Sequence, residues 1–144
     1  MSGVEILSAL IAAIAIYIAY QQWSTNKLRL KHELYDRRFK VYKAVQIHLS
    51  HVLTHAKIGG EETAALANAM QDARFLMNEK MHNYIHEIYI KSIKMRSKQE
   101  QYKDLPVGDE RSKLVEEEHE NLGWLTDQLP KLHIVFGPFL KLSK

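Results

Sequence analysis

Residues 4–20 read VEILSALIAAIAIYIAY, an apolar run whose single charge, Glu5, lies at its edge. A helix of this length is just long enough to cross the hydrocarbon layer of a membrane. Ser2 and Glu5 have the spacing of a capping box, in which the two side chains satisfy free backbone amides of the first helical turn. The sequence therefore predicts a transmembrane anchor over residues 1–23, with its helix beginning almost at the first residue.

The residues after this run indicate how the anchor is oriented. Aromatic rings with a polar edge favour the headgroup layer, and Tyr17, Tyr20 and Trp23 gather where the helix would leave the bilayer. Residues 1–4 carry no basic side chain, whereas the chain beyond Trp23 is basic, with Lys27, Arg29, Lys31, Arg37, Arg38, Lys40 and Lys43. Because Lys and Arg are retained on the cytoplasmic side, we expect a single-pass protein of the bacterial inner membrane with its N-terminus outside and its C-terminal domain in the cytoplasm. Trp23 and the cations up to Lys40 are assigned to lipid contact and orientation, since each cation near an anionic leaflet gains about 1 kcal/mol.

Two other interpretations fit an apolar N-terminal run. A cleaved signal peptide would use Ala13-Ile14-Ala15 as its small-x-small site, but no basic region precedes the run. A core helix of a soluble protein can also be this apolar, yet an amphipathic core helix has a polar face, which residues 4–20 lack. The anchor is therefore the favoured interpretation.

Small side chains form one stripe along the anchor. They recur at alternating spacings of four and three residues, and Gln22 and Asn26 continue the pattern beyond Ser8, Ala12, Ala15 and Ala19. Small residues let two membrane helices approach closely, while bulky ones suit contact with lipid. The stripe therefore predicts that the protein is a homo-oligomer associated through the anchor. An unpaired anchor is the alternative, because alanine is common in any membrane span.

The anchor is expected to continue into one long helix, because no Pro or Gly interrupts residues 4–58. Its second part, residues 24–58, is basic and amphipathic. Apolar residues recur there at every seventh position, with others between them: Leu28, Tyr35, Tyr42, Leu49 and Ala56, then Phe39, Val45, Val52 and Leu53. This face, Tyr35 and Tyr42 included, is predicted to enter a core, and Gly59-Gly60 is predicted to end the helix.

Residues 61–144 supply the remaining helices. The sequence predicts a second helix over residues 61–77, and a third that Asn78 caps and whose core face holds Met81, Ile85, Ile88, Ser92 and Met95. A turn at residues 105–108 and a cap at Asp109 begin a fourth helix, whose Glu-rich first half would meet the Lys and Arg residues that end the third. Pro130 should kink or end that helix before a last apolar piece, residues 132–142, which Gly137-Pro138 breaks again. The predicted fold is all-α: an N-terminal transmembrane helix that continues into an antiparallel bundle of about four helices.

Several segments resemble a known set of proteins. They are residues 27–30 (KLRL), 34–42 (LYDRRFKVY), 72–76 (DARFL), 105–112 (LPVGDERS) and 114–119 (LVEEEH). With them the chain resembles a widespread set of small bacterial single-span membrane proteins with a cytoplasmic helical domain. The resemblance runs from the anchor through Leu129, and Pro130 departs from it. It implies the same architecture and brings neither an activity nor site residues.

The residue types exclude several kinds of chemistry. The 144 residues contain no cysteine, which excludes disulfides, thiolate metal sites and cysteine nucleophiles. Eight histidines include His48, His51 and His55 near one helix face and His82 and His86 four residues apart, but no HExxH pattern accompanies them. The run Glu116-Glu117-Glu118 is interpreted as a solvated surface that pairs with Lys and Arg. We expect no catalytic residues, no bound cofactor and no metal.

These observations favour a non-enzymatic, membrane-anchored helical module that self-associates or recruits a cytoplasmic protein partner. One alternative is an oligomeric membrane-perturbing or pore-forming effector, in which Ser8, Gln22 and Asn26 would line a path. A metal-dependent or nucleotide enzyme is the least favoured class, because Gly59-Gly60 lacks the Lys-Ser/Thr of a phosphate-binding loop. Nucleic acid is a disfavoured partner. The aromatic side chains Tyr35, Phe39 and Tyr42 could stack on bases, but their spacing favours a place in the helical core.

Overall fold

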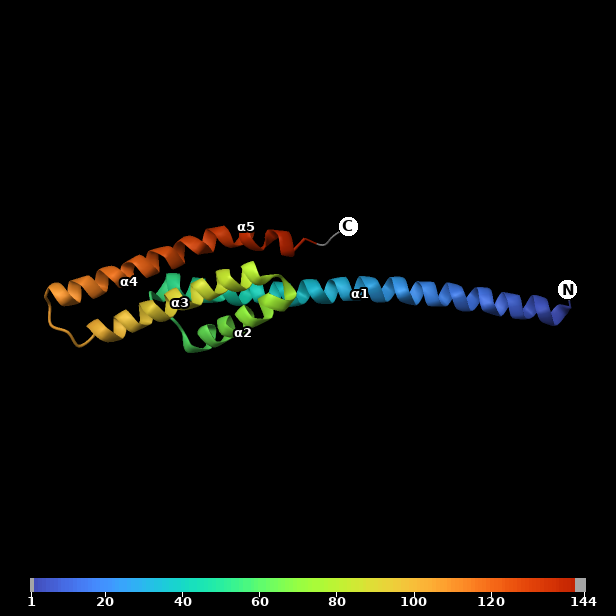
Figure 1. Cartoon of the computed structure of the whole chain (residues 1–144), viewed down its shortest axis with the longest axis horizontal. Coiled ribbons are helices and arrows are strands. Elements are labelled where there is room, and N and C mark those ends of the chain that lie inside the picture. The colour runs from blue at the N-terminus through green and yellow to red at the C-terminus, as the bar shows by residue number, and fades with distance from the viewer. Residues whose placement is uncertain (1, 142–144) are drawn as a thin grey trace. The chain divides into compact units, whose positions relative to one another are not determined.

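The computed structural model describes residues 2–141 and is helical along most of that length (Figure 1). The helices are α1 Gly3–His55, α2 Gly60–Leu76, α3 Glu79–Tyr102, α4 Asp109–Gln128 and α5 Leu132–Phe136, with 3₁₀ turns η1 Leu129–Lys131 and η2 Gly137–Phe139. No strand forms within the described residues, which confirms the all-α class. Residues 1 and 142–144, which include the end of the predicted last apolar piece, lie outside the described part.

Helix α1 is continuous from Gly3 to His55, as the absence of internal Pro and Gly predicts. The chain nevertheless divides into two compact units, one ending at Leu34 and the other beginning at Tyr35. We call them unit 1 and unit 2 and describe each by itself. Unit 1 is the N-terminal part of α1, and unit 2 holds the rest of α1 with every later helix.

Both ends of α1 are defined by identifiable contacts. At its start, the Ser2 backbone amide donates to Glu5 Oε2 at 2.8 Å and the Glu5 amide lies 3.4 Å from Ser2 Oγ, which confirms the capping box. At its end, the prediction that Gly59-Gly60 terminates the helix is wrong. The helix ends at His55 because Ala56 adopts a left-handed conformation with φ 51°, a position that glycine usually fills.

The core of unit 2 draws on every long helix. Its part of α1 contributes Val41, Val45, Leu49 and Val52, each almost fully buried. Tyr42 of the predicted face is partly buried and packs against the core, whereas the prediction is wrong for Leu53, which is exposed, and for Tyr35, which stacks on Phe39 outside the core. A strict seven-residue repeat drifts by about 20° per repeat around a straight helix, so one face cannot stay buried over the four repeats from Leu28 to Ala56. The other core residues are Leu66, Ala69, Met70, Ala73, Met81, Ile85, Ile88, Met95, Leu125, Leu132 and Phe136.

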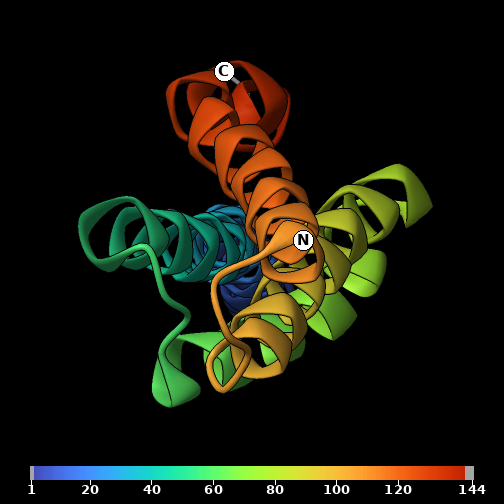
Figure 2. The same cartoon turned by 90° about the vertical axis from the view of Figure 1, so that its left-hand side faces the viewer.

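Two side-chain contacts fix the relative direction of α3 and α4 in unit 2. The Lys98 ammonium lies 2.6 Å from Glu117 Oε2, and the Tyr84 hydroxyl donates to Gln128 Oε1 at 3.1 Å, so α3 and α4 run antiparallel. The first pair also confirms that opposite charges meet across this hairpin. Helices α2 and α3 form a second hairpin, and Figure 2 shows the helices of unit 2 from the end where the α3–α4 connection lies.

The helix caps and breaks predicted after α2 are confirmed, with one exception. Asn78 Oδ1 accepts from the Met81 amide at 2.9 Å and caps α3 as predicted. Pro130 lies in η1 and ends α4 at Gln128, also as predicted. Gly108, not Asp109, occupies the N-cap of α4, so Asp109 lies within the first turn, where its charge complements the helix dipole.

Candidate functional site

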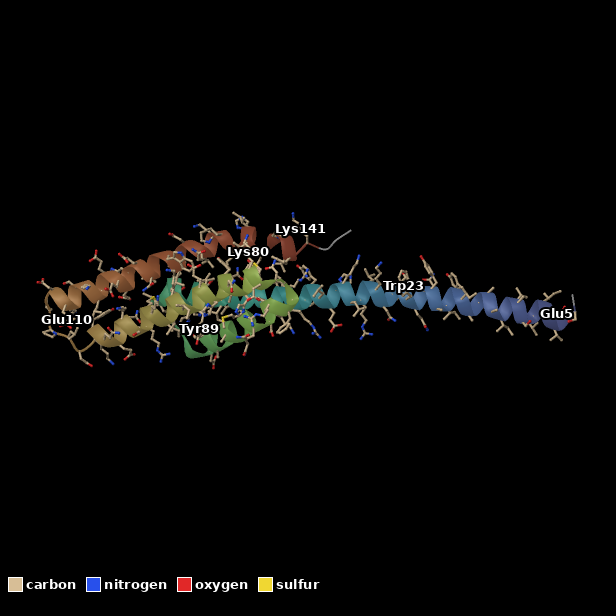
Figure 3. The ribbon with its side chains drawn as sticks, in the orientation of Figure 1. Glu5, Trp23, Lys80, Tyr89, Glu110 and Lys141 are labelled. Atoms are coloured by element: carbon tan, nitrogen blue, oxygen red, sulfur yellow. The ribbon has the colours of Figure 1, made fainter. Side chains whose placement is uncertain are left out.

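Unit 1 presents an apolar surface that the chain itself does not cover. An 18-residue window near the N-terminus of α1 has a mean hydropathy of 2.0, and none of it is buried. Figure 3 shows side chains standing out all around this part of α1, between the labelled Glu5 and Trp23. By length and composition this one helix of the described residues can cross a membrane, a test that signal sequences and core helices also pass.

The stripe of small residues lies open along unit 1. Ser8, Ala12, Ala15 and Ala19 are all exposed, and helical geometry places them within a narrow arc of the α1 surface. The Ser8 hydroxyl donates to the Glu5 carbonyl at 3.0 Å, so its hydrogen is already used inside the helix. The face that remains is small and mostly apolar, which suits close helix–helix contact better than the lining of an aqueous path.

Aromatic and cationic side chains meet where the apolar run ends. The rings of Tyr20 and Trp23 lie 6.1 Å apart, and the Lys27 ammonium lies 5.1 Å from the Trp23 ring centroid. Cation–π contact of this kind holds the cation beside the ring. Lys27, Arg29, Lys31, Arg37 and Lys40 are exposed, as an orientation signal requires.

Arg38 is placed differently from the other predicted orientation residues. Its guanidinium donates to the Leu76 carbonyl at 2.7 Å and to the Phe139 carbonyl at 3.4 Å, and it lies 5.8 Å from the Phe139 ring. These contacts tie α1 to the end of α2 and to η2. Arg38 therefore has a structural role inside unit 2, where its charge satisfies carbonyls at helix ends.

The rings of His51 and His55 stack with their centroids 4.3 Å apart, while His48 faces Ser92. His48 is fully buried, with Nε2 2.8 Å from Ser92 Oγ, while His51 Nδ1 lies 3.6 Å from Glu62 Oε1 and His55 Nδ1 lies 3.1 Å from the His51 carbonyl. Within residues 2–141, no three His, Cys, Asp or Glu side chains are grouped to hold a metal ion. His48 is 0% exposed and lies on the core face of α1 with Val45 and Val52.

His82 is the second buried histidine, and its ring is fully hydrogen-bonded. Its Nδ1 lies 2.8 Å from the Met70 carbonyl, and its Nε2 lies 2.9 Å from the Arg74 guanidinium. Arg74 can only donate, so Nε2 accepts and Nδ1 carries the proton. The His82 ring therefore joins α2 to α3, and His86 stacks beside it at 6.2 Å from ring to ring.

A buried carboxylate is the feature that the sequence analysis missed. Glu118, predicted to be part of a solvated run, is only 4% exposed. Its Oε1 accepts from Gln99 Nε2 and its Oε2 accepts from the Tyr102 hydroxyl, both at 2.8 Å. Burial, with the hydrogen bond to Glu118, raises the pKa of Tyr102 above its ordinary value.

The helix period contains the signal that could have identified Glu118. It stands seven residues before Leu125 and four after Leu114, so it lies on the apolar stripe of α4. Its partners Gln99 and Tyr102 lie on α3, and only the α3–α4 hairpin brings them within reach. A charged residue on a core stripe therefore indicates polar partners on a neighbouring helix.

The geometry defines an all-helical protein with one helix able to span a membrane and a compact helical unit. Comparison with known proteins adds no closer assignment: no family model, no curated protein and no solved structure matches this chain.

Proposed function

We propose that this protein is a membrane-anchored helical module in which residues 4–20 cross the bilayer and unit 2 lies in the cytoplasm. The observation that carries the proposal is the fully exposed apolar surface of unit 1. Exposed apolar patches of this extent are rare on soluble monomers, and a bilayer would cover the whole of this one. The basic residues that follow the apolar run support the orientation, because Lys27, Arg29, Lys31 and Lys40 are exposed and cations near an anionic leaflet are retained on the cytoplasmic side.

The module serves to bring unit 2 to the membrane, where it associates with other copies or with a cytoplasmic protein. The continuity of α1 supports this function, because residues of this one helix belong to both the apolar unit 1 and unit 2.

The topology can be tested with single cysteines, since the chain contains none. Gly108→Cys should resist a membrane-impermeant maleimide in intact spheroplasts that produce the full chain, and should react after lysis. Position 108 suits the label, because no atom lies within 4 Å of a Cβ there and its φ of 169° is extended backbone.

Gly3→Cys is the matched control, because a Cβ at that position also meets nothing within 4 Å. This variant should react in intact spheroplasts, since the proposal places residue 3 outside. Labelling of Gly108→Cys without lysis would show that unit 2 lies outside and would contradict the proposed orientation. A chain shortened near Ala15 would instead identify a cleaved signal peptide.

Self-association through the anchor is the second expectation to test. Ala15→Ile should reduce chemically cross-linked dimers and higher oligomers several-fold, because association in lipid depends on close backbone approach at small residues. The measurement is cross-linking of the full chain in neutral detergent and in membranes.

Ile14→Ala is the control, since position 14 lies about 100° around the helix from position 15. Its cross-linking should stay close to that of the parent. If all three chains cross-link equally, any association occurs through unit 2. If the parent is monomeric at every concentration, both the self-association proposal and the pore alternative are wrong.

A further inference from the structure

A polar pocket of about 570 Å³ opens in unit 2, and its lining includes none of the residues assigned above to lipid contact. It lies where the α1–α2 connection meets the end of α3 and the first turn of α4, close to the Glu110 labelled in Figure 3. The side chains and backbone that line it are those of Lys57, Ile58, Gly60, Arg96, Gln99, Glu100, Tyr102, Lys103 and Arg111.

The lining is strongly cationic. Four of its side chains are basic and one, Glu100, is acidic. Within the described part of the chain, Lys57, Arg96 and Lys103 make no side-chain hydrogen bond or ion pair. Cations that face one hollow repel each other, and the described residues supply no partner to offset that repulsion. An anion in the pocket would remove this cost.

One wall of the pocket is held in place by partly buried polar contacts. Arg111 donates to the Leu105 carbonyl at 3.1 Å, and its guanidinium lies 5.9 Å from the Tyr102 ring. Tyr102 and Gln99 are in turn both hydrogen-bonded to the buried Glu118. Because each of these side chains is fixed before any ligand arrives, the wall is preorganised, and little side-chain entropy is lost on binding.

The opposite wall is fixed through the backbone. Gln99 Nε2 also donates to the Ala56 carbonyl at 2.7 Å. That carbonyl belongs to the residue with the left-handed φ of 51°, immediately before Lys57. Gln99, which is also bonded to Glu118, thus holds the backbone immediately before Lys57, one of the pocket's cations.

We propose that this pocket binds a multiply charged phosphate, a phosphomonoester or a polyphosphate. Two guanidinium groups and two ammonium groups match the several oxygens of such an anion, and guanidinium groups pair with phosphate through two parallel hydrogen bonds. The volume is within the range of small-molecule sites. The same chemistry is offered by a free polyphosphate compound and by a phosphomonoester lipid headgroup. The inference goes beyond the proposed anchoring function and does not depend on it.

The test is isothermal titration of the full chain in neutral detergent with pyrophosphate, ATP and glycerol 3-phosphate. The first two probes represent free polyphosphates, and the third represents a phosphomonoester headgroup without its acyl chains. Binding should weaken about tenfold in Arg96→Gln and in Lys103→Gln, because each removes charge-assisted hydrogen bonds to the anion. Both side chains are exposed and unpaired, so thermal unfolding of the variants should match that of the parent.

Lys94→Gln is the matched control, since it removes a charge from the same helix outside the pocket. It should leave the affinity unchanged, and Lys57→Gln replaces either test variant that fails to fold. Binding of pyrophosphate or ATP with this pattern supports a free polyphosphate ligand, and binding of glycerol 3-phosphate alone supports a headgroup. If no probe binds at millimolar concentration, or if all variants bind as the parent does, the proposal is wrong.

Discussion

Titration of His48 is expected to lower the free energy of unfolding of unit 2 by about 3 kcal/mol between pH 7 and pH 4. The His48 side chain is fully buried, with its Nε2 2.8 Å from Ser92 Oγ. Ser92 already donates its hydroxyl to the Ile88 carbonyl at 2.8 Å, so neutral His48 donates from Nε2. Its Nδ1 has no partner within the described residues, and a second proton there would be a buried, unsatisfied donor.

The direction of the pH effect follows from the two states of the chain. Burial, with a smaller contribution from His51 and an opposing one from Glu62, lowers the pKa of His48 from 6.5 to about 4. Below pH 6.5 His48 is therefore protonated in the unfolded chain, whereas in the folded chain it stays neutral until the pH falls to about 4. The stabilisation from neutral His48 is fully present above pH 6.5 and is lost as the pH falls to about 4.

The measurement is urea unfolding of the full chain in neutral detergent across this pH range. His48→Gln keeps an amide donor near Ser92 but does not titrate, so its free energy of unfolding should depend less on pH, by about 3 kcal/mol. His119→Gln, a change at an exposed histidine of α4, should keep the parent's dependence. A His48→Gln chain with the same pH dependence as the parent would show that His48 titrates normally in the folded state.

Local sequence signals predicted the parts of the fold that depend on neighbouring residues. The Ser2–Glu5 box, the Asn78 cap and the break at Pro130 act within one helical turn, so the residues that cause them are adjacent in the chain. The core face of α3, including Met81, was also predicted, because alternating spacings of four and three residues match the period of an α-helix.

Features that depend on distant residues could not be predicted in the same way. Ala56 ends α1 although glycines follow it, and its carbonyl is bonded to Gln99 on α3. Glu118 is buried because Gln99 and Tyr102 meet it across a hairpin. The pocket is formed by the α1–α2 connection, the end of α3 and the first turn of α4 together. The sequence of any one of these segments does not indicate that the other two lie beside it.

Phe136→Ala is expected to lower the free energy of unfolding by about 3–5 kcal/mol, the usual cost of removing a buried aromatic side chain. Phe136 lies beyond Pro130, in α5, and is fully buried. Its ring meets the Tyr42 ring edge-on, with centroids 5.5 Å apart and planes at 66°. The substitution would therefore leave a cavity between α5 and α1 and remove an aromatic contact.

Ile134→Ala is the control within the same short helix. Ile134 is 67% exposed, so its truncation should change the free energy of unfolding by no more than about 0.5 kcal/mol. Urea unfolding at pH 7 compares both variants with the parent. Since Arg38 also bonds the Phe139 carbonyl, α1 holds the segment after Pro130 at two points, one apolar and one polar. Equal stability of Phe136→Ala and the parent would mean that this segment does not pack on the core in solution, and that α1 to α4 form the stable unit without it.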